Sequence, residues 1–164
     1  MKYMIIGGVA GGASTAARLR RLDEQAEIIL FEKGEYISYA NCGLPYYIGG
    51  VIEERERLFV QTPESFKARF NIEVRIKSEV KAIEPENKQV VIKDWATGKT
   101  YRESFDKLVL SPGAEPVLPP WEGIRTEGIF TLRNVADTDR IKAWAGRQEV
   151  KKAVVVGAGF IGLE

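Results

Sequence analysis

The first part of the chain alternates short apolar runs with a longer segment of helical character. Residues 2–6 form an apolar run that ends at a glycine, and residues 27–31 (EIILF) form a second. Both patterns are typical of strands buried in a sheet. The segment between them, from Gly11 to about Asp23, is rich in Ala, Leu and Arg and predicts a helix. Strand, glycine turn, helix and strand within about 30 residues indicate a βαβ unit with parallel strands.

The middle of the chain has a different pattern. Residues 35–50 are rich in Tyr and Gly, predict a loop and contain Cys42. Thr62 followed by Pro63 predicts a helix over about residues 63–70, because Thr is a good cap and Pro suits the first helical position. Apolar runs separated by turn residues then predict antiparallel strands at residues 80–83, 89–92 and 100–105.

The last part of the chain predicts two strands and a helix. Residues 107–110 indicate a further buried strand, and the proline-rich residues 111–120 indicate a linker or an extended crossing. A helix is expected at 135–144 and an apolar strand at 153–156, followed directly by a glycine turn. The sequence ends at Glu164, inside that turn, so we expect a fragment of a larger protein.

Composition and charge exclude several classes of protein. The chain has 164 residues, enough for roughly one domain. Its 24 basic and 23 acidic residues give a net charge of +1, which argues against a nucleic-acid binder. The absence of histidine excludes Ser-His-Asp triads and histidine zinc sites in this chain, and we expect no metal site. No apolar run approaches the ~18 residues of a membrane span, so no membrane association is expected.

Two glycine-rich turns are candidates for binding dinucleotides. Gly157, Gly159 and Gly162 match the G-x-G-x-x-G pattern after a predicted strand, where the backbone can approach a pyrophosphate. Gly7, Gly8, Gly11 and Gly12 form the first turn, but Val9 occupies the place of the central glycine. Glu32 ends the next predicted strand, near the ~20-residue spacing of a ribose-binding carboxylate. The alternatives are a structural turn and a solvated charge at a strand end. Two such turns suggest one flavin and one nicotinamide.

The first predicted helix has two unlike faces. Gly12, Ala13, Ala16 and Leu19 share a small apolar face suited to packing on a sheet, whereas Ser14, Arg18 and Arg21 lie on the opposite face. This polar face is either simply solvated or a site for a multiply phosphorylated substrate, because arginine matches phosphate geometry.

Cys42 is the sole cysteine, so no intrachain disulfide forms and a reducing cytoplasm is expected. Ser38 and Asn41 offer polar contacts to its sulfur. A short helix starting just after Cys42 would stabilise a thiolate. The alternative is a buried, inert cysteine.

Four segments together resemble the single-cysteine branch of the flavin- and pyridine-nucleotide-dependent disulfide reductases, of the coenzyme A disulfide reductase type. They are IIGGVAGGA, SYANCGLPYY, KLVLSPGAEP and VVVGAGFIGLE, starting at residues 5, 38, 107 and 154. The resemblance implies an α/β fold: a Rossmann-like FAD-binding domain with a parallel sheet and an antiparallel β-meander, cut off at the start of a second Rossmann-like domain for NAD(P)H. The implied division is 1–112 for the first FAD segment, 113–150 for a connecting segment and 151–164 for the start of the NAD(P)H domain.

The resemblance also implies roles for individual residues. Cys42 matches the redox nucleophile of the family. The residues matched to the coenzyme A site are Ser14, Arg18, Arg21, Ser38 and Asn41. Those matched to FAD are Gly7, Gly8, Val9, Ala10, Gly11, Gly12, Glu32, Lys33, Ser111, Pro112 and Gly113, and those matched to NAD(P)H are Gly157, Gly159 and Gly162. Many relatives have Thr where this chain has Ser111-Pro112.

The implied reaction transfers electrons from NAD(P)H through FAD to Cys42, which reduces coenzyme A disulfide in a cytoplasmic homodimer. A persulfide or polysulfide reductase is an open alternative. An NADH oxidase or peroxidase is a second, although such relatives typically have a histidine where this chain has Ala10. A third alternative is a non-catalytic nucleotide-binding fragment, and we expect the isolated 164 residues to be inactive as a reductase.

Overall fold

The computed structural model describes residues 1–157 and 159–163. The contacts within the chain divide it into two compact units, each described separately below. The first unit comprises Met1–Tyr39 and Phe59–Gly113, and the second comprises Ala40–Leu58 and the residues from Ala114 onward.

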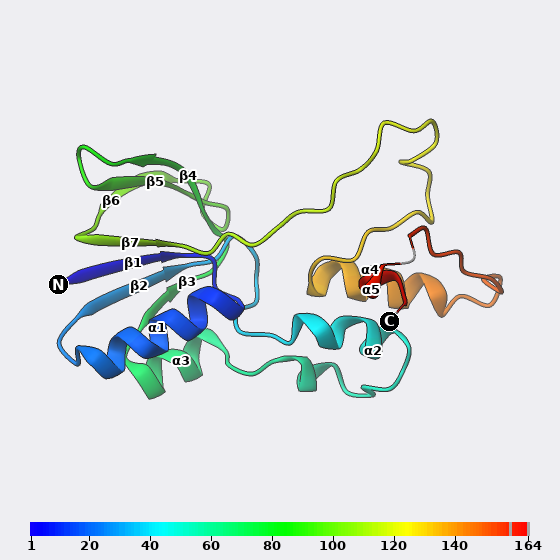
Figure 1. Ribbon diagram of the computed structural model, residues 1–164, viewed down its shortest axis with the longest axis horizontal. Helices are drawn as coiled ribbons and strands as arrows, with labels where there is room; N and C mark the ends of the chain where they lie inside the picture. Colours follow the sequence, from blue (N-terminus) through cyan, green and yellow to red (C-terminus); the bar gives the residue numbers. More distant parts are fainter. Residues whose placement is uncertain (158, 164) are drawn as a thin grey trace. The chain divides into compact units, whose positions relative to one another are not determined.

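The first unit is built on a parallel sheet with the strand order β3-β2-β1-β7. Strands β1 (Lys2–Ile6), β2 (Glu27–Phe31) and β7 (Lys107–Leu110) coincide with predicted strands. Helices α1 (Ala10–Leu22) and α3 (Pro63–Phe70) cover one face of this sheet (Figure 1). The predicted βαβ unit is confirmed, because β1 and β2 pair in parallel with Met4 opposite Ile29.

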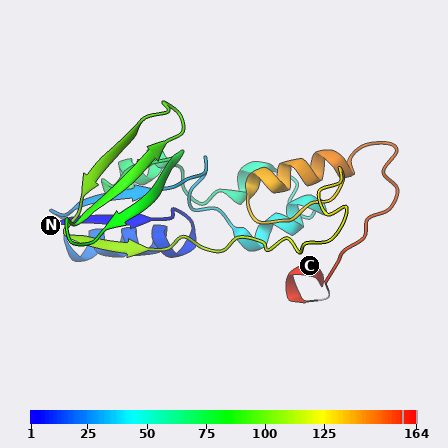
Figure 2. The same cartoon turned by 90° about the horizontal axis from the view of Figure 1, so that it is seen from above.

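A three-stranded antiparallel sheet, in the order β4-β5-β6, covers the other face of the parallel sheet (Figures 1 and 2). Its strands are β4 (Ser78–Glu84), β5 (Gln89–Asp94) and β6 (Thr100–Ser104). These agree with the predicted antiparallel strands, and the α/β fold class with its β-meander is confirmed.

Alternate residues of the central strands enter two separate cores. Ile5, Ile28 and Leu30 pack with Ala13 and Ala16 of α1 and with Phe66 of α3. Met4, Ile29 and Phe31 pack with Val90 and Ile92 of β5. Both faces of β1 and β2 are therefore buried, and this is why these strands are continuously apolar in sequence.

One expectation for this unit is wrong, and one strand was missed. β7 is not a buried strand: it lies at the edge of the sheet, and Leu110 is 59% exposed. Strand β3 (Glu73–Arg75) was not predicted, because it has only three residues and two of them are charged.

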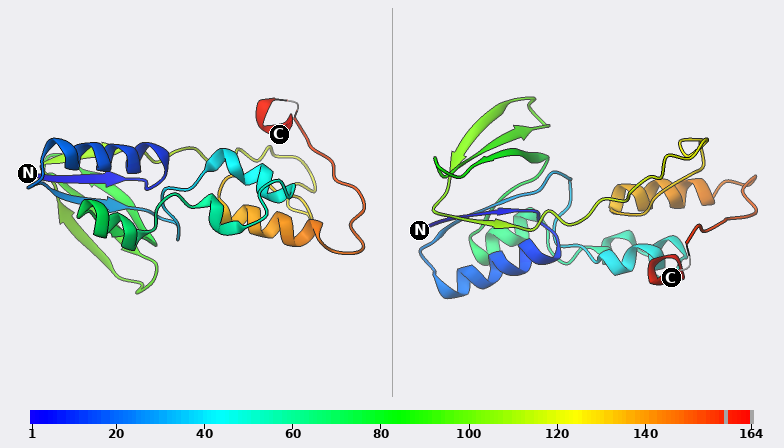
Figure 3. Two further views of the ribbon diagram at one scale, coloured as in Figure 1. Left: turned by 90° about the horizontal axis from the view of Figure 1, so that it is seen from below. Right: turned by 45° about the horizontal axis from the view of Figure 1, so that its top comes forward.

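The second unit contains short helical elements. They are the 3₁₀ turns η1 (Asn41–Gly43) and η2 (Arg55–Leu58), and the helices α2 (Leu44–Ile48), α4 (Val135–Ala145) and α5 (Phe160–Leu163). The predicted loop at residues 35–50 therefore contains helical structure at its centre. Helix α2 packs on α4, and the chain continues from α4 as an irregular segment towards α5 (Figure 3).

The strand predicted at residues 153–156 is wrong. These residues have no regular structure, and Val154, Val155 and Val156 are exposed. Apolar sequence alone does not make a strand, because a strand also needs a neighbouring strand to accept and donate backbone hydrogen bonds. Within residues 1–157 and 159–163, no strand pairs with this segment.

Helices α3 and α4 begin at reciprocal caps. The Thr62 hydroxyl accepts a bond from the Ser65 amide, and the Ser65 hydroxyl accepts one from the Thr62 amide, as the Thr62-Pro63 sequence predicts. In α4, Asn134 and Asp137 form the same pair of contacts.

A charged cluster joins the two sheets of the first unit. The Glu103 carboxylate of β6 accepts bonds from Lys2 Nζ of β1 at 2.6 Å and from Arg75 Nη1 of β3 at 2.7 Å. Partial burial by itself would raise the pKa of Glu103, but the bonds from Lys2 and Arg75 outweigh it and hold that pKa below its usual value. The cluster therefore stabilises the folded state when Glu103 is ionised.

We predict that Glu103→Gln lowers the free energy of unfolding by about 1–3 kcal/mol, because Lys2 and Arg75 each lose one of their two carboxylate partners and keep only Glu27 and Glu73. The pKa of Glu103 is depressed in the folded state, so its contribution is present above the unfolded pKa and is lost as the pH falls through the folded pKa. Urea unfolding of the full-length protein at neutral and acidic pH should show the difference from wild type shrink in acid. Glu86→Gln, at an exposed turn, is the control; an equal effect of both substitutions would contradict the prediction.

Candidate functional site

The first glycine turn connects β1 to α1 through a close backbone contact. Gly7 has a φ of +98°, a region that favours glycine. A Cβ on Gly12 would lie 1.8 Å from the Gly7 carbonyl oxygen, so no side chain fits at that position. The turn therefore brings the start of α1 directly over the end of β1, even though Val9 replaces the central glycine of the pattern.

The start of α1 differs from the starts of α3 and α4. Val9 is the N-cap residue and provides no side-chain hydrogen bond, and the first turn contains no acidic residue. The amino-terminal N–H groups of a helix favour an anion when no side chain satisfies them. This end of α1, at the carboxyl edge of the parallel sheet, has the chemistry of a phosphate site.

Glu32 braces the first turn through both of its carboxylate oxygens. Oε2 accepts a hydrogen bond from the Gly8 amide at 2.8 Å, and Oε1 accepts one from the Gly34 amide at 2.7 Å. The alternative of a merely solvated strand-end charge is therefore wrong. Each oxygen keeps a second lone pair, so the carboxylate can still accept a bond from a ligand hydroxyl.

Ser111 follows β7 and lies against the same turn. Its amide donates to the Ile6 carbonyl at 2.8 Å, and a Cβ on Gly7 would lie 1.9 Å from the Ser111 carbonyl oxygen. The predicted residues 7–12, 32 and 111 are thus brought together at one edge of the sheet. Gly113, nearby in sequence, has a φ of +73°, and Lys33 is exposed.

The outer face of α1 is exposed, as its polar sequence predicts. Ser14, Arg18 and Arg21 are all exposed, whereas Gly12, Ala13 and Ala16 are buried against the sheet. Arg20 has a different role that sequence reasoning missed. Its guanidinium donates to the carbonyl oxygens of Phe70 and Asn71, each at 2.8 Å, and thereby caps the end of α3.

Cys42 lies in η1, directly before α2, and it is exposed. The alternative of a buried cysteine is therefore wrong. A short helix does follow Cys42, as expected. It has only five residues, so the helix dipole that would stabilise a thiolate is small. Gly43 is buried next to it, where a Cβ would lie 3.2 Å from Leu58 Cδ2.

The two polar residues predicted near Cys42 differ in their surroundings. Asn41 belongs to the second unit with Cys42, and its buried Oδ1 has no hydrogen-bond partner among the described residues. Ser38 belongs to the first unit, where its amide donates to the Gly8 carbonyl at 2.9 Å. Its φ of +47° places it in the left-handed region, so the chain turns sharply beside the glycine turn.

The second glycine turn shares two features with the first. Gly157 has a φ of +112°, and a Cβ on Gly162 would lie 2.1 Å from the Gly157 carbonyl oxygen. Gly159 has no neighbouring atom within 4 Å of an added Cβ. Glu164, which ends the fourth motif, lies outside the described residues.

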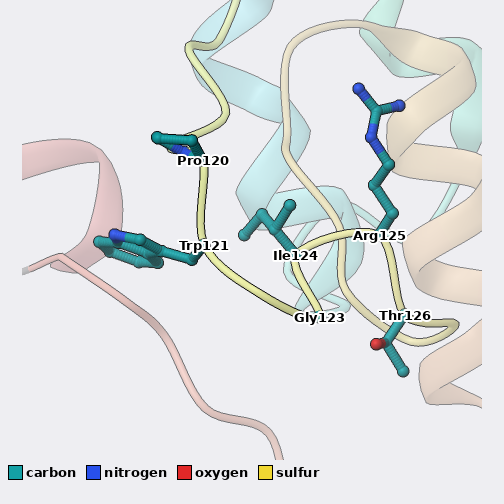
Figure 4. Close-up of a pocket in the computed structure, with 6 residues that line it drawn as sticks. All are labelled: Pro120, Trp121, Gly123, Ile124, Arg125 and Thr126. Atoms are coloured by element: carbon teal, nitrogen blue, oxygen red, sulfur yellow. The ribbon is translucent and has the colours of Figure 1, made fainter.

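A shallow pocket of about 530 Å³ lies in the second unit (Figure 4). One continuous stretch of chain lines it: Pro120, Trp121, Gly123, Ile124, Arg125 and Thr126. It includes none of the predicted site residues.

The described residues contain no group of three or more Cys, Asp or Glu side chains arranged to hold a metal ion. Within the same part of the chain, no helix has both the length and the apolar character needed to span a membrane.

The family model for the pyridine nucleotide-disulphide oxidoreductases matches residues 1–164, and the chain belongs to this family. It is 44% identical over 163 residues to the coenzyme A disulfide reductase of Staphylococcus haemolyticus, covering 99% of this chain and 36% of that protein. The chain thus spans about a third of the length of the curated relatives it matches. The predicted Rossmann-like fold class agrees with this family.

Several solved structures are similar over most of the chain, and two of them are the following. The reduced CoADR-RHD of Bacillus anthracis is 57% identical with a TM-score of 0.97, over 99% of this chain and 29% of that one. The NAD-dependent persulfide reductase of A. fulgidus is 37% identical with a TM-score of 0.83, over 88% of this chain and 27% of that one.

We predict that Glu32→Gln loosens the first glycine turn, because an amide nitrogen cannot accept the bond from Gly8 or Gly34. The Gly8 or Gly34 amide of the full-length protein should then exchange with deuterium roughly tenfold faster, which corresponds to a loss of about 1.4 kcal/mol in local stability. Glu24→Gln, on the exposed segment after α1, is the matched control. Unchanged exchange at both amides would show that the carboxylate does not brace the turn.

Proposed function

We propose that the full-length protein is a flavin-dependent oxidoreductase that passes electrons from NAD(P)H through FAD to Cys42, which reduces coenzyme A disulfide. The observation that carries this proposal is the exposed, sole cysteine in a chain 44% identical to a coenzyme A disulfide reductase. The isolated chain spans only a third of such a protein, so the activity belongs to the full-length form.

The chain's first glycine turn fits the pyrophosphate of FAD. The N-terminus of α1 lacks a side-chain cap, Gly12 lets α1 start directly against the end of β1, and Glu32 has lone pairs left for a ribose. When bound, FAD would accept a hydride from NAD(P)H and supply two electrons for disulfide cleavage. We assign to FAD the residues Gly7, Gly8, Val9, Ala10, Gly11, Gly12, Glu32, Lys33, Ser111, Pro112 and Gly113.

The second glycine turn is proposed to hold NAD(P)H through Gly157, Gly159 and Gly162, since it repeats the close Gly-to-Gly contact of the first turn. This supports the proposed division of the chain into a first FAD segment (1–112), a connecting segment (113–150) and the start of an NAD(P)H domain (151–164).

Residues of both units are proposed to bind the substrate, on the outer face of α1 in the first unit and next to Cys42 in the sequence. Arg18 and Arg21 are exposed, as expected of guanidinium groups that bind the phosphates of coenzyme A. Asn41 Oδ1 has no donor among the described residues, so a substrate amide could provide one. Ser14 and Ser38 complete the proposed set.

The proposed chemistry of Cys42 needs no histidine. Its thiolate attacks one sulfur of coenzyme A disulfide, which forms a Cys42–coenzyme A mixed disulfide and releases the first coenzyme A thiolate. Two electrons then cleave the mixed disulfide, which restores the Cys42 thiolate and releases the second coenzyme A thiolate. In sum, one disulfide, one NAD(P)H and one proton yield two thiols and NAD(P)⁺.

The proposal also includes a homodimer and a cytoplasmic location. A reducing cytoplasm is proposed because a reactive free thiol persists there.

A persulfide reductase is the second candidate, and the similarity to the A. fulgidus enzyme favours it. Turnover of coenzyme A disulfide, coenzyme A persulfide, oxygen and peroxide by the full-length protein would separate these candidates from an oxidase or peroxidase.

We predict that Cys42→Ser abolishes disulfide reduction, by at least about 1,000-fold, because the hydroxyl does not exchange with disulfides. FAD binding and the reduction of ferricyanide by NAD(P)H should remain, since ferricyanide takes electrons without the thiol. Disulfide reduction and ferricyanide reduction are both measured by the loss of NAD(P)H absorbance. Disulfide reduction that survives in the variant would overturn the assignment of Cys42.

A further inference from the structure

The segment that contains Cys42 is a closed loop with its own packing. The Ala40 amide donates to the Leu58 carbonyl at 2.8 Å, which joins the two ends of the segment. Inside it, Gly43 and Leu44 are buried, and Gly43 lies against Leu58 and Ile52. Cys42, η1 and α2 are therefore parts of one small folded unit.

Helix α4 packs on this segment with one of its faces. Val135, Thr138, Asp139 and Lys142 share that face by their helical spacing. Val135 and Thr138 are buried, whereas Asp139 and Lys142 are half-buried and charged. A half-buried charge on a packing face needs a partner. Both residues have one in the segment Ala40–Leu58, called the cysteine segment below.

Asp139 pairs with the far end of the segment. Arg55 of η2 donates from Nη2 to Asp139 Oδ2 at 2.7 Å and from Nε to Oδ1 at 2.9 Å. This two-point contact fixes the orientation of both groups, since the guanidinium and the carboxylate are planar.

Lys142 contacts the helix that follows Cys42. Its ammonium donates to the carbonyl oxygen of Tyr47, near the end of α2, and lies 4.0 Å from the centre of the Tyr47 ring. A cation at the carboxyl end of a helix stabilises the exposed carbonyl groups there. A five-residue helix is marginal by itself, so this contact matters more than it would on a long helix.

We propose that Asp139 and Lys142 are positioning residues for Cys42: α4 braces both α2 and η2, and so holds the thiol in a reactive orientation. The inference rests on the proposed role of Cys42. It assigns a function to two residues that lie 84 and 95 positions from their partners in the sequence and far from any motif.

The test uses the full-length protein loaded with FAD and the variants Lys142→Met and Asp139→Asn. We expect each to lower kcat for disulfide reduction roughly tenfold, because small displacements of a reacting group cost large factors in rate. Ferricyanide reduction, which does not need Cys42, should stay unchanged. Lys142→Arg and Asp139→Glu should restore most of the lost activity, and Lys67→Met, on the exposed face of α3, is the control.

The inference would be overturned if both variants kept full disulfide reduction. It would also be overturned if disulfide reduction and ferricyanide reduction fell by the same factor. If Lys142→Met does not fold, Asp139→Asn carries the same test at the other end of the cysteine segment. A separate variant tests the proposed function itself. If Cys42 is not the nucleophile, Cys42→Ser retains disulfide reduction, and this result does not depend on the α4 variants.

Discussion

The contact between Gly7 and Gly12 is the constraint on which the first unit depends. Only glycine at position 12 lets α1 start against the end of β1, since a Cβ there would overlap the Gly7 carbonyl. This contact places α1 on the face of the sheet where Ala13 and Ala16 are buried with Ile5. It also leaves the uncapped start of α1 beside Glu32 and Ser111, so the same feature shapes the core and the candidate nucleotide site. The second glycine turn repeats this contact between Gly157 and Gly162.

Local signals were enough to predict most of the first unit. Strands β1 and β2 are buried on both faces, which makes them continuously apolar and easy to recognise. Helix α3 begins where Thr62 and Pro63 predict, because the cap is a contact between close neighbours. The buried and exposed faces of α1 followed from helical periodicity alone. The sequence around Cys42 did not decide whether its side chain is exposed, because a buried cysteine was also compatible with the same neighbours.

The features that sequence reasoning missed depend on partners far along the chain. Strand β3 is three residues long and exists through its pairing with β2. Residues 153–156 are apolar enough for a strand but have no partner in the part of the chain that the structure describes. Arg20 belongs to no motif in the sequence, yet it caps α3 through Phe70 and Asn71. Asp139 and Lys142 belong to no sequence motif. Their contacts with η2 and α2 arise only when α4 packs on these elements.

The proposed function depends on exchange between the Cys42 sulfur and a coenzyme A disulfide. Mass spectrometry of the full-length protein, after incubation with coenzyme A disulfide and without NAD(P)H, measures this exchange. We expect the peptide containing Cys42 to gain the mass of one coenzyme A through a mixed disulfide, and we expect NAD(P)H then to release it. A Cys42 peptide that stays unmodified, while the protein still turns over the disulfide, would rule the exchange out.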